Sequence, residues 1–279
     1  MDSIEKLIKQ AIAEDVGDGD HTSLATIPQD ATGKMKLLVK EEGIIAGVEI
    51  AKKVFLEIDP GILMTTLIRD KAQVKKGDVV FYVSGSCRSM LMAERTVLNF
   101  MQRMSGIATS TFDYAKMLCG TKTRLLDTRK TTPNMRIFEK MAVVMGGGMN
   151  HRMGLYDMVM IKDNHVDFAG GITNAIEAQH TYLTQIGKPL KIEIEVRSFA
   201  ELAEVMLMGG VDRIMLDNFT PEKLKKAVEL IDGKFETEAS GGITLDNIAD
   251  YAHCGVDFIS VGAITHHIKS LDLSLKAVE

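Results

Sequence analysis

The sequence of 279 residues has no tryptophan and only three cysteines, Cys87, Cys119 and Cys254. The cysteines are widely spaced, odd in number and form no Cys-x-x-Cys pair. This pattern suggests neither a disulfide framework nor a zinc site. Cysteines that need not pair are typical of proteins in a reducing compartment, so we expect a cytoplasmic location.

An excess of basic residues is missing too. The chain has 33 Lys and Arg against 38 Asp and Glu, which gives a formal net charge of -5. A protein that binds a nucleic-acid backbone normally presents a basic surface, so we expect no nucleic-acid partner. Any binding of anions must therefore come from a local cluster of cations.

Long apolar runs are absent as well. No run approaches the roughly 20 residues that a membrane-spanning helix needs. Residues 1–16 have the charged amphipathic pattern of a helix rather than the basic start and apolar core of a secretory signal. We therefore expect neither membrane insertion nor secretion. Hydrophobic residues still make up 46% of the chain, enough for one large domain or two unequal ones.

The first part of the chain reads as a small α+β domain. Residues 33–86 contain short strand and turn patterns around one helical stretch. Residues 89–117 then follow a helical periodicity, and Ser105-Gly106 predicts a break at which the chain leaves this domain. The final residues, 268–277, have the pattern of a helix that could return to it.

Beyond Cys119 short apolar strands alternate with helical stretches, which predicts parallel strands and a β/α barrel. Six strands are clear, at residues 124–127, 158–161, 192–196, 213–216, 235–239 and 258–261. A complete barrel has eight, so we expect an incomplete barrel or one with a strand that the pattern hides. In such barrels the carboxyl ends of the strands carry the chemistry.

Cations cluster at these predicted strand ends and in the glycine-rich stretch at residues 146–152. They are Arg129, Lys130, His151, Arg152, Lys162 and His165. Arginine offers a planar fork for carboxylates and phosphates, and lysine a compact charge, so the mixture indicates a ligand with several anionic groups. Taken singly, each could be a solvated surface charge. Their shared place at the barrel mouth favours the binding site.

Two acids and two glycine-containing turns complete the predicted mouth. Glu195 and Asp217 supply hard oxygen ligands for a magnesium ion shared with substrate phosphates, although Glu195 could instead form a structural salt bridge with Lys162 or Arg213. The SGGI turn at 240–243 and the SVGA turn at 260–263 follow the last two strands. Their glycines let backbone N–H groups approach a phosphate.

Several motifs together resemble the quinolinate phosphoribosyltransferase family over nearly the whole chain. The most specific are DTRKTTP at 127–133, NHRMGLYD at 150–157 and IKDNH at 161–165. Supporting matches are ERTVLN at 94–99, SGIAT at 105–109, the strand that ends at Glu195, LDN at 216–218 and SGGI at 240–243. Departures from the family pattern are Val144, Met145 and Met149, none of which removes a charged residue of these motifs.

The resemblance implies an α/β protein with a small α+β open-sandwich N-terminal domain and an incomplete, seven-stranded α/β barrel. We expect the N-terminal domain at residues 1–106, with a C-terminal helix at 267–279 returning to it, and the catalytic barrel at 107–266. It also implies a homodimer, or a larger homo-oligomer built from dimers, in which the active sites combine both subunits.

The same resemblance implies roles for individual residues. Arg129, His151, Arg152 and Lys162, with Arg95 of the neighbouring subunit, would surround the two carboxylates of quinolinate. Lys130 would lie near the pyrophosphate, and Glu195 and Asp217 would bind Mg²⁺ and the ribose-pyrophosphate. Ser240, Gly241, Gly242 and Gly262 would hold the 5-phosphate. The catalytic set would be Lys130, Lys162, Glu195 and Asp217.

The implied reaction is phosphoribosyl transfer from 5-phosphoribosyl 1-pyrophosphate to quinolinate with decarboxylation, which gives nicotinate mononucleotide, pyrophosphate and CO₂ in NAD biosynthesis. Three alternatives remain: a paralogue with the same donor and a different acceptor, a barrel aldolase or decarboxylase that uses Lys162 as a Schiff-base amine, and a non-catalytic phosphate sensor. The retained cations argue against the first, and Lys130, Glu195 and Asp217 against the third.

Overall fold

The computed structural model describes residues 3–278, which divide into two compact units. Of the described residues, unit 1 comprises 3–112, 131–147 and 264–278, and unit 2 comprises 113–130 and 148–263. The predicted domains, in contrast, placed residues 131–147 with the barrel. Within the described chain, no helix combines the length and the apolar character that crossing a bilayer requires.

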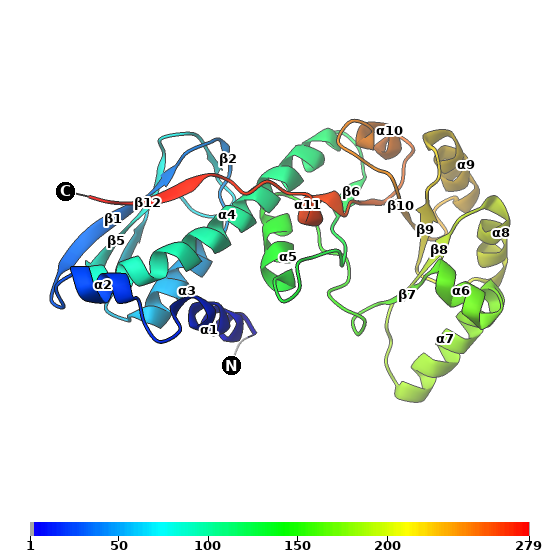
Figure 1. Ribbon diagram of the computed structural model, residues 1–279. Coiled ribbons are helices and arrows are strands. Elements are labelled where there is room, and N and C mark those ends of the chain that lie inside the picture. Colours follow the sequence, from blue (N-terminus) through cyan, green and yellow to red (C-terminus); the bar gives the residue numbers. More distant parts are fainter. Residues whose placement is uncertain (1–2, 279) are drawn as a thin grey trace. The chain divides into compact units, whose positions relative to one another are not determined.

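Unit 1 is built on a four-stranded antiparallel sheet with the order β12-β1-β5-β3 (Figure 1). Its strands are β1 (Thr32–Val39), β3 (Leu63–Thr66), β5 (Val79–Ser86) and β12 (Leu273–Ala277), and β2 (Gly43–Ile44) pairs separately with β4 (Gln73–Val74). The helices are α1 (Ser3–Val16), α2 (His21–Thr26), α3 (Val48–Ile58) and α5 (Arg136–Met145), with α4 (Cys87–Met117) extending past the unit boundary. This sheet with its helices is the predicted small α+β domain.

The helix predicted at 267–279 is wrong. Residues Leu273–Ala277 form β12, which runs antiparallel to β1 with Leu37 opposite Leu275. Leu273 and Leu275 are buried, whereas Ser274 between them and Lys276 after them are more exposed. This alternation has the period of a strand, and the edge of β1 supplies the backbone partners. The segment does return to the N-terminal sheet.

The break predicted at Ser105-Gly106 is also wrong, because α4 continues through both residues. The buried Ser105 hydroxyl accepts the Ala46 N–H at 2.9 Å. At Gly106 a Cβ would overlap the carbonyl oxygen of Lys269. Glycine is needed here for the close approach of another backbone segment and not for a change in chain direction.

Unit 2 contains a parallel sheet of six strands with the order β6-β11-β10-β9-β8-β7. The strands are β6 (Arg124–Leu126), β7 (Val159–Ile161), β8 (Ile192–Val196), β9 (Arg213–Asp217), β10 (Glu236–Ser240) and β11 (Phe258–Ser260). They confirm the six strands read from the sequence. Instead of a seventh strand, Met149 makes a single parallel bridge to Leu126, so the described residues of the sheet do not form a closed barrel.

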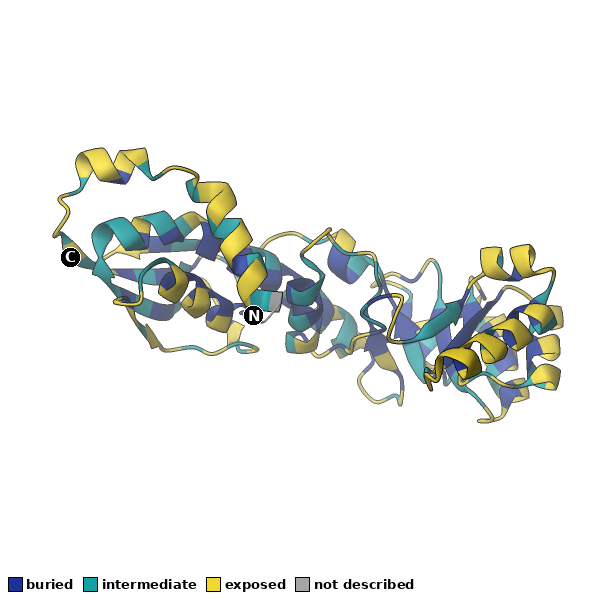
Figure 2. Cartoon of the chain, turned by 90° about the horizontal axis from the view of Figure 1, so that it is seen from below, coloured by how far each residue is buried: buried dark blue, intermediate teal, exposed yellow. Residues whose placement is uncertain are grey.

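Helices follow the strands of unit 2 and cover the outer side of the sheet (Figure 1). They are α6 (Asp163–Ala169), α7 (Ile172–Ile186), α8 (Phe199–Met208), α9 (Pro221–Ile231) and α10 (Ile248–Ala252), and the short α11 (Ala263–His266) lies at the boundary between the units. Their outward faces are exposed, while the strands beneath them are mostly buried (Figure 2). All five residues of β8 are buried, including Glu193 and Glu195. The inner face of this sheet therefore carries buried charge.

Candidate active site

Predicted site residues lie at the carboxyl ends of all six parallel strands in unit 2. Arg129 and Lys130 follow β6, Lys162 follows β7, and Gly262 follows β11. Glu195, Asp217 and Ser240 lie in the last two positions of β8, β9 and β10. Because the strands are parallel, these ends share one edge of the sheet, where barrel enzymes bind their substrates.

Lys162 and the two predicted metal ligands meet at this edge. The Lys162 Nζ lies 3.0 Å from Glu195 Oε2, so the salt bridge considered for Glu195 is present. Burial raises the pKa of Asp217, while a hydrogen bond from Asn218 and the charge of Lys162 oppose the shift. Asp217 is thus a half-buried carboxylate whose negative charge a cation would stabilise.

The turn after β10 closely contacts the end of β9. Asn218 has a left-handed backbone (φ 56°), donates its amide Nδ2 to Asp217 Oδ2 at 2.6 Å, and donates its N–H to the Ser240 carbonyl at 2.8 Å. Gly241 has φ 92°, and a Cβ there would overlap the Asn218 side chain. Gly241 is therefore required beside Asn218. The LDN motif contains this asparagine, but the sequence alone gave it no role.

Arg129 and Arg152 lie close enough to repel each other. Burial lowers the pKa of Arg152, and the nearby charge of Arg129 lowers it further. The Arg152 guanidinium also donates to the Met158 carbonyl at 3.1 Å, which fixes its direction. Two like charges brought together in a half-buried place indicate a site for an anion, because an anion would remove the repulsion.

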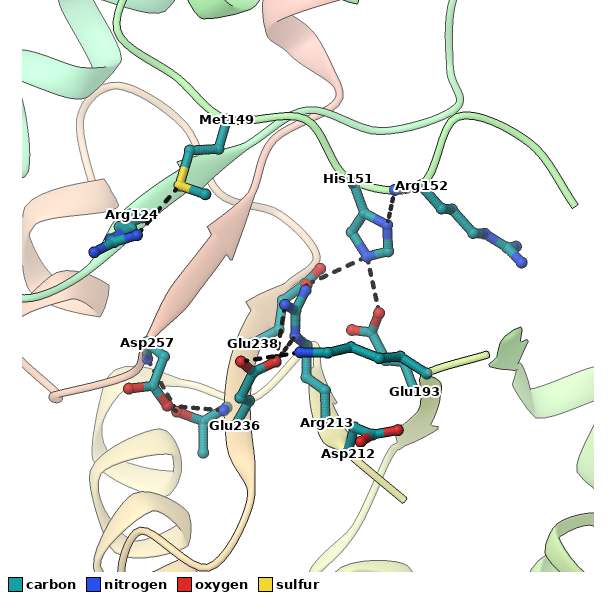
Figure 3. A network of polar contacts seen from close by, with 12 residues as sticks. Arg124, Met149, His151, Arg152, Glu193, Asp212, Arg213, Glu236, Glu238 and Asp257 are labelled. Carbon is teal, nitrogen blue, oxygen red and sulfur yellow. Dashed lines mark hydrogen bonds and ion pairs between the residues drawn. The ribbon is translucent and has the colours of Figure 1, made fainter. Parts of the chain in front are cut away.

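His151 lies beneath this edge, with its side chain pointing into the sheet (Figure 3). Its side chain is 4% exposed, and its Nε2 is 2.8 Å from Glu193 Oε2 and 3.4 Å from Glu238 Oε2. The ring Nδ1 accepts the backbone N–H of Arg152 at 2.7 Å. The backbone N–H of His151 donates to Oδ1 of the buried Asp127 at 2.8 Å. Both ring nitrogens are thus engaged within unit 2.

The charges around His151 form a cluster on three neighbouring strands (Figure 3). Arg213 of β9 contacts Glu238 Oε2 at 3.1 Å and Glu236 Oε2 at 3.0 Å, and lies 4.0 Å from the ring centroid of Phe258. Sequence reasoning assigned no role to Glu238 and offered Arg213 only as a salt-bridge partner of Glu195. The alternating glutamates of β8 and β10 were the available signal, because they place charge on an inner face.

Arg95 and His165, two further predicted cations, have other surroundings. Arg95 is exposed on α4 in unit 1, so it is not among the residues that the sheet of unit 2 assembles. His165 lies in the first turn of α6, where its Nδ1 accepts the Lys162 N–H at 2.9 Å. This contact caps the start of the helix.

Among the described residues, His151, Glu193 and Glu238 are the one group whose ligand atoms are close enough for a metal, within 4.8 Å of one another. Arg213 already places a cation against Glu238 in that cluster. Glu195 and Asp217 end adjacent strands at the sheet edge and offer carboxylate oxygens, the ligand type that Mg²⁺ prefers.

Comparison with known proteins gives matches over nearly the whole chain. The family model for the N-terminal domain of quinolinate phosphoribosyl transferase matches residues 20–105, and that for the C-terminal domain matches residues 107–276. The chloroplastic, carboxylating nicotinate-nucleotide pyrophosphorylase of Arabidopsis thaliana is 46% identical over 291 residues, which cover 98% of this chain and 82% of the relative. The decarboxylating quinolinate phosphoribosyltransferase 1b of Nicotiana tabacum is 45% identical over 288 residues, with the same coverage.

A solved structure gives the same result. The nicotinate-nucleotide pyrophosphorylase of Francisella tularensis is 40% identical and superimposes with a TM-score of 0.92, covering 99% of this chain and 96% of that one. Sequence, fold and the residues at the sheet edge thus agree, and the chain belongs to the quinolinate phosphoribosyltransferase family.

Proposed function

We propose that this enzyme transfers the phosphoribosyl group of 5-phosphoribosyl 1-pyrophosphate to quinolinate and releases pyrophosphate and CO₂. The observation that carries the proposal is the gathering of cations and acids at one sheet edge, with Arg129 beside Arg152 and Lys162 beside Glu195 and Asp217. Quinolinate has two carboxylates, and its phosphoribosyl donor has several phosphate charges. Cations for the acceptor and acids for a donor-bound metal suit this pair of substrates.

Arg129, Arg152 and Lys162 bind the two carboxylates of quinolinate in this proposal. They hold the ring nitrogen against the anomeric carbon of the donor, and this orientation supplies much of the rate. As the bond to pyrophosphate breaks, negative charge grows on the leaving oxygens, and Lys130 stabilises it. Ser240, Gly241, Gly242 and Gly262 hold the 5-phosphate through the turns after β10 and β11.

We propose Asp217 and Glu195 as the residues that hold Mg²⁺ together with the donor. A bound Mg²⁺ would neutralise the pyrophosphate as it leaves. The fit rests on Asp217, since burial raises its pKa and a cation would relieve that cost. Glu195 would have to share its carboxylate between the metal and Lys162.

The Schiff-base alternative receives less support. An amine that attacks a carbonyl needs its nitrogen lone pair free, and the Lys162 Nζ is instead held in an ion pair with Glu195 at 3.0 Å. Borohydride should therefore leave no adduct on Lys162 in the presence of substrate.

We also propose a homodimer in which Arg95 of one subunit completes the quinolinate site of the other, and a cytoplasmic location. The exposure of Arg95 on α4 supports the first, because the guanidinium is available to a second chain. The three cysteines are unpaired, which fits a reducing compartment.

The direct test incubates the enzyme with donor, Mg²⁺ and either quinolinate or nicotinate. Quinolinate should give nicotinate mononucleotide, and nicotinate should be a far poorer acceptor because it leaves one carboxylate-binding group without its partner. Equal use of the two acceptors would contradict the proposal.

A further inference from the structure

Two carboxylates lie too deep in unit 2 to touch a substrate. Glu193 of β8 and Glu238 of β10, here called the buried carboxylate pair, both have no exposed surface. One oxygen of each, Oε1, has no hydrogen-bond partner among the described residues. Buried carboxylates with an unsatisfied oxygen destabilise a fold, so their presence indicates a role other than stability.

His151 connects this pair to the sheet edge. On one side its Nε2 faces both carboxylates, at 2.8 and 3.4 Å. On the other side its Nδ1 accepts the N–H of Arg152. The imidazole therefore links the interior charges to the backbone of the arginine that we propose as a carboxylate ligand.

Arg213 completes the cluster from β9, the strand between the two that carry the pair. Because Nδ1 accepts the Arg152 N–H, the imidazole carries its proton on Nε2, which faces the pair, while Arg213 supplies the positive charge beside Glu238. A metal ion in the same place would have to displace that proton and lie beside the Arg213 guanidinium. The contacts that Arg213 and His151 already make with the pair favour a positioning role over a metal site.

We infer that the buried carboxylate pair, held by Arg213, acts through His151 to position Arg152 for a carboxylate of quinolinate. The inference rests on the proposed function for the identity of the ligand. In this arrangement His151 and the pair are positioning residues: they orient the group that binds the substrate, and their own polar atoms face the protein.

The kinetic test uses Glu238→Gln, with Glu236→Gln as a matched control. Glu236 lies two residues earlier on β10 and contacts the same Arg213, at 3.0 Å, but from the partly exposed rim. Glu238→Gln should raise the KM for quinolinate about tenfold or more and change the KM for the donor little, because a displaced binding group weakens one substrate selectively. Glu236→Gln should behave like the wild type, and equal effects of the two variants would overturn the inference.

A double-mutant cycle tests whether the pair acts through His151. If it does, adding Glu238→Gln to His151→Ala should change the quinolinate KM no further, since the connecting ring is already gone. Additive effects would show that Glu238 acts by another route and would overturn the inference.

NMR of the wild-type enzyme provides a test that needs neither a folded variant nor turnover. The ring Nε2 proton of ¹⁵N-labelled His151 should exchange slowly with solvent, both in the free enzyme and with benzene-1,2-dicarboxylate added. Fast exchange, or transfer of the Nε2 contact to the added dicarboxylate, would contradict the positioning role. Absence of turnover with quinolinate would contradict the proposed function, whereas the exchange rate of the His151 proton would still be measurable because it does not depend on catalysis.

Discussion

The proposed use of the phosphoribosyl donor depends most directly on Asp217. Asp217→Asn removes the negative charge but keeps the shape, so kcat/KM for the donor should fall on the order of a hundredfold or more while the melting temperature changes little. Asp212→Asn is a matched control at the other end of β9, where Asp212 accepts the Ile192 N–H at 2.7 Å. Steady-state kinetics with both variants would decide. Unchanged donor kinetics in Asp217→Asn would refute the metal-binding role.

The charge of His151 should be visible as a pH dependence of stability. Burial alone would lower its pKa, but Glu193 and Glu238 raise it to about 9. An unfolded histidine titrates near 6.5. The folded chain holds a second ring proton, on Nδ1, more tightly than the unfolded chain does, so this stabilisation is complete below about pH 6.5 and is lost as the pH rises toward 9. Only the form without that proton accepts the Arg152 N–H at Nδ1.

Urea unfolding at several pH values, compared between the wild type and His151→Phe, measures that loss. Burial and Glu238 raise the pKa of Glu193 to about 7. The change in unfolding free energy that Glu193 causes therefore lies mainly at pH values below 7. Between pH 7 and 9.5 the wild type should lose more unfolding free energy than the variant, while the nearby Glu238, Arg152 and Arg213 keep their charges. Parallel pH profiles would show that His151 is not charged as described.

At the scale of elements, α4 depends on one glycine. Ala is about 1 kcal/mol better than Gly in an exposed helix interior, so Gly106→Ala would normally stabilise. Here the added Cβ would overlap the Lys269 carbonyl, and we expect a loss of about 1–3 kcal/mol instead. Ser110→Ala, one turn further along α4, is the control. Chemical unfolding gives both values, and a Gly106→Ala protein that is more stable than the wild type would contradict the packing described.

The errors of sequence interpretation also belong to this scale. The six parallel strands could be predicted from their short, largely apolar runs, because that pattern lies within each segment itself. In contrast, residues 271–275 alternate leucine with polar residues, a strand signal that becomes decisive only beside β1, 230 or more residues earlier in the chain. The Ser105-Gly106 pair was read as a break for the same reason: its partners, Ala46 and Lys269, are distant in sequence.

For the whole molecule, sequence motifs were enough to indicate the family and the residues at the sheet edge. The strand order, and with it the adjacency of Glu195 and Asp217, was confirmed only by the pairing of β8 with β9. The cluster of Glu193, Arg213 and Glu238 around His151 was not predicted as a unit. It requires three strands to lie side by side, which no local pattern specifies.

The shared active site can be tested by mixing two inactive variants. Arg95→Ala and Arg129→Ala should each be nearly inactive alone, since each lacks one proposed carboxylate-binding arginine at both sites. If Arg95 acts across the interface, a mixed dimer has one complete site. Random reassortment of equal amounts makes half the dimers mixed, which predicts roughly a quarter of the wild-type activity. No recovery in a sample with mixed dimers verified by mass spectrometry would rule out the shared site.

The central claim is that quinolinate is both the acceptor and the source of CO₂. The most direct measurement supplies quinolinate labelled at the carboxylate next to the ring nitrogen and counts labelled CO₂ and pyrophosphate in the same reaction. The account predicts one CO₂ for each pyrophosphate, with both dependent on the enzyme and on the donor. Pyrophosphate without labelled CO₂, or CO₂ released in the absence of the donor, would contradict it.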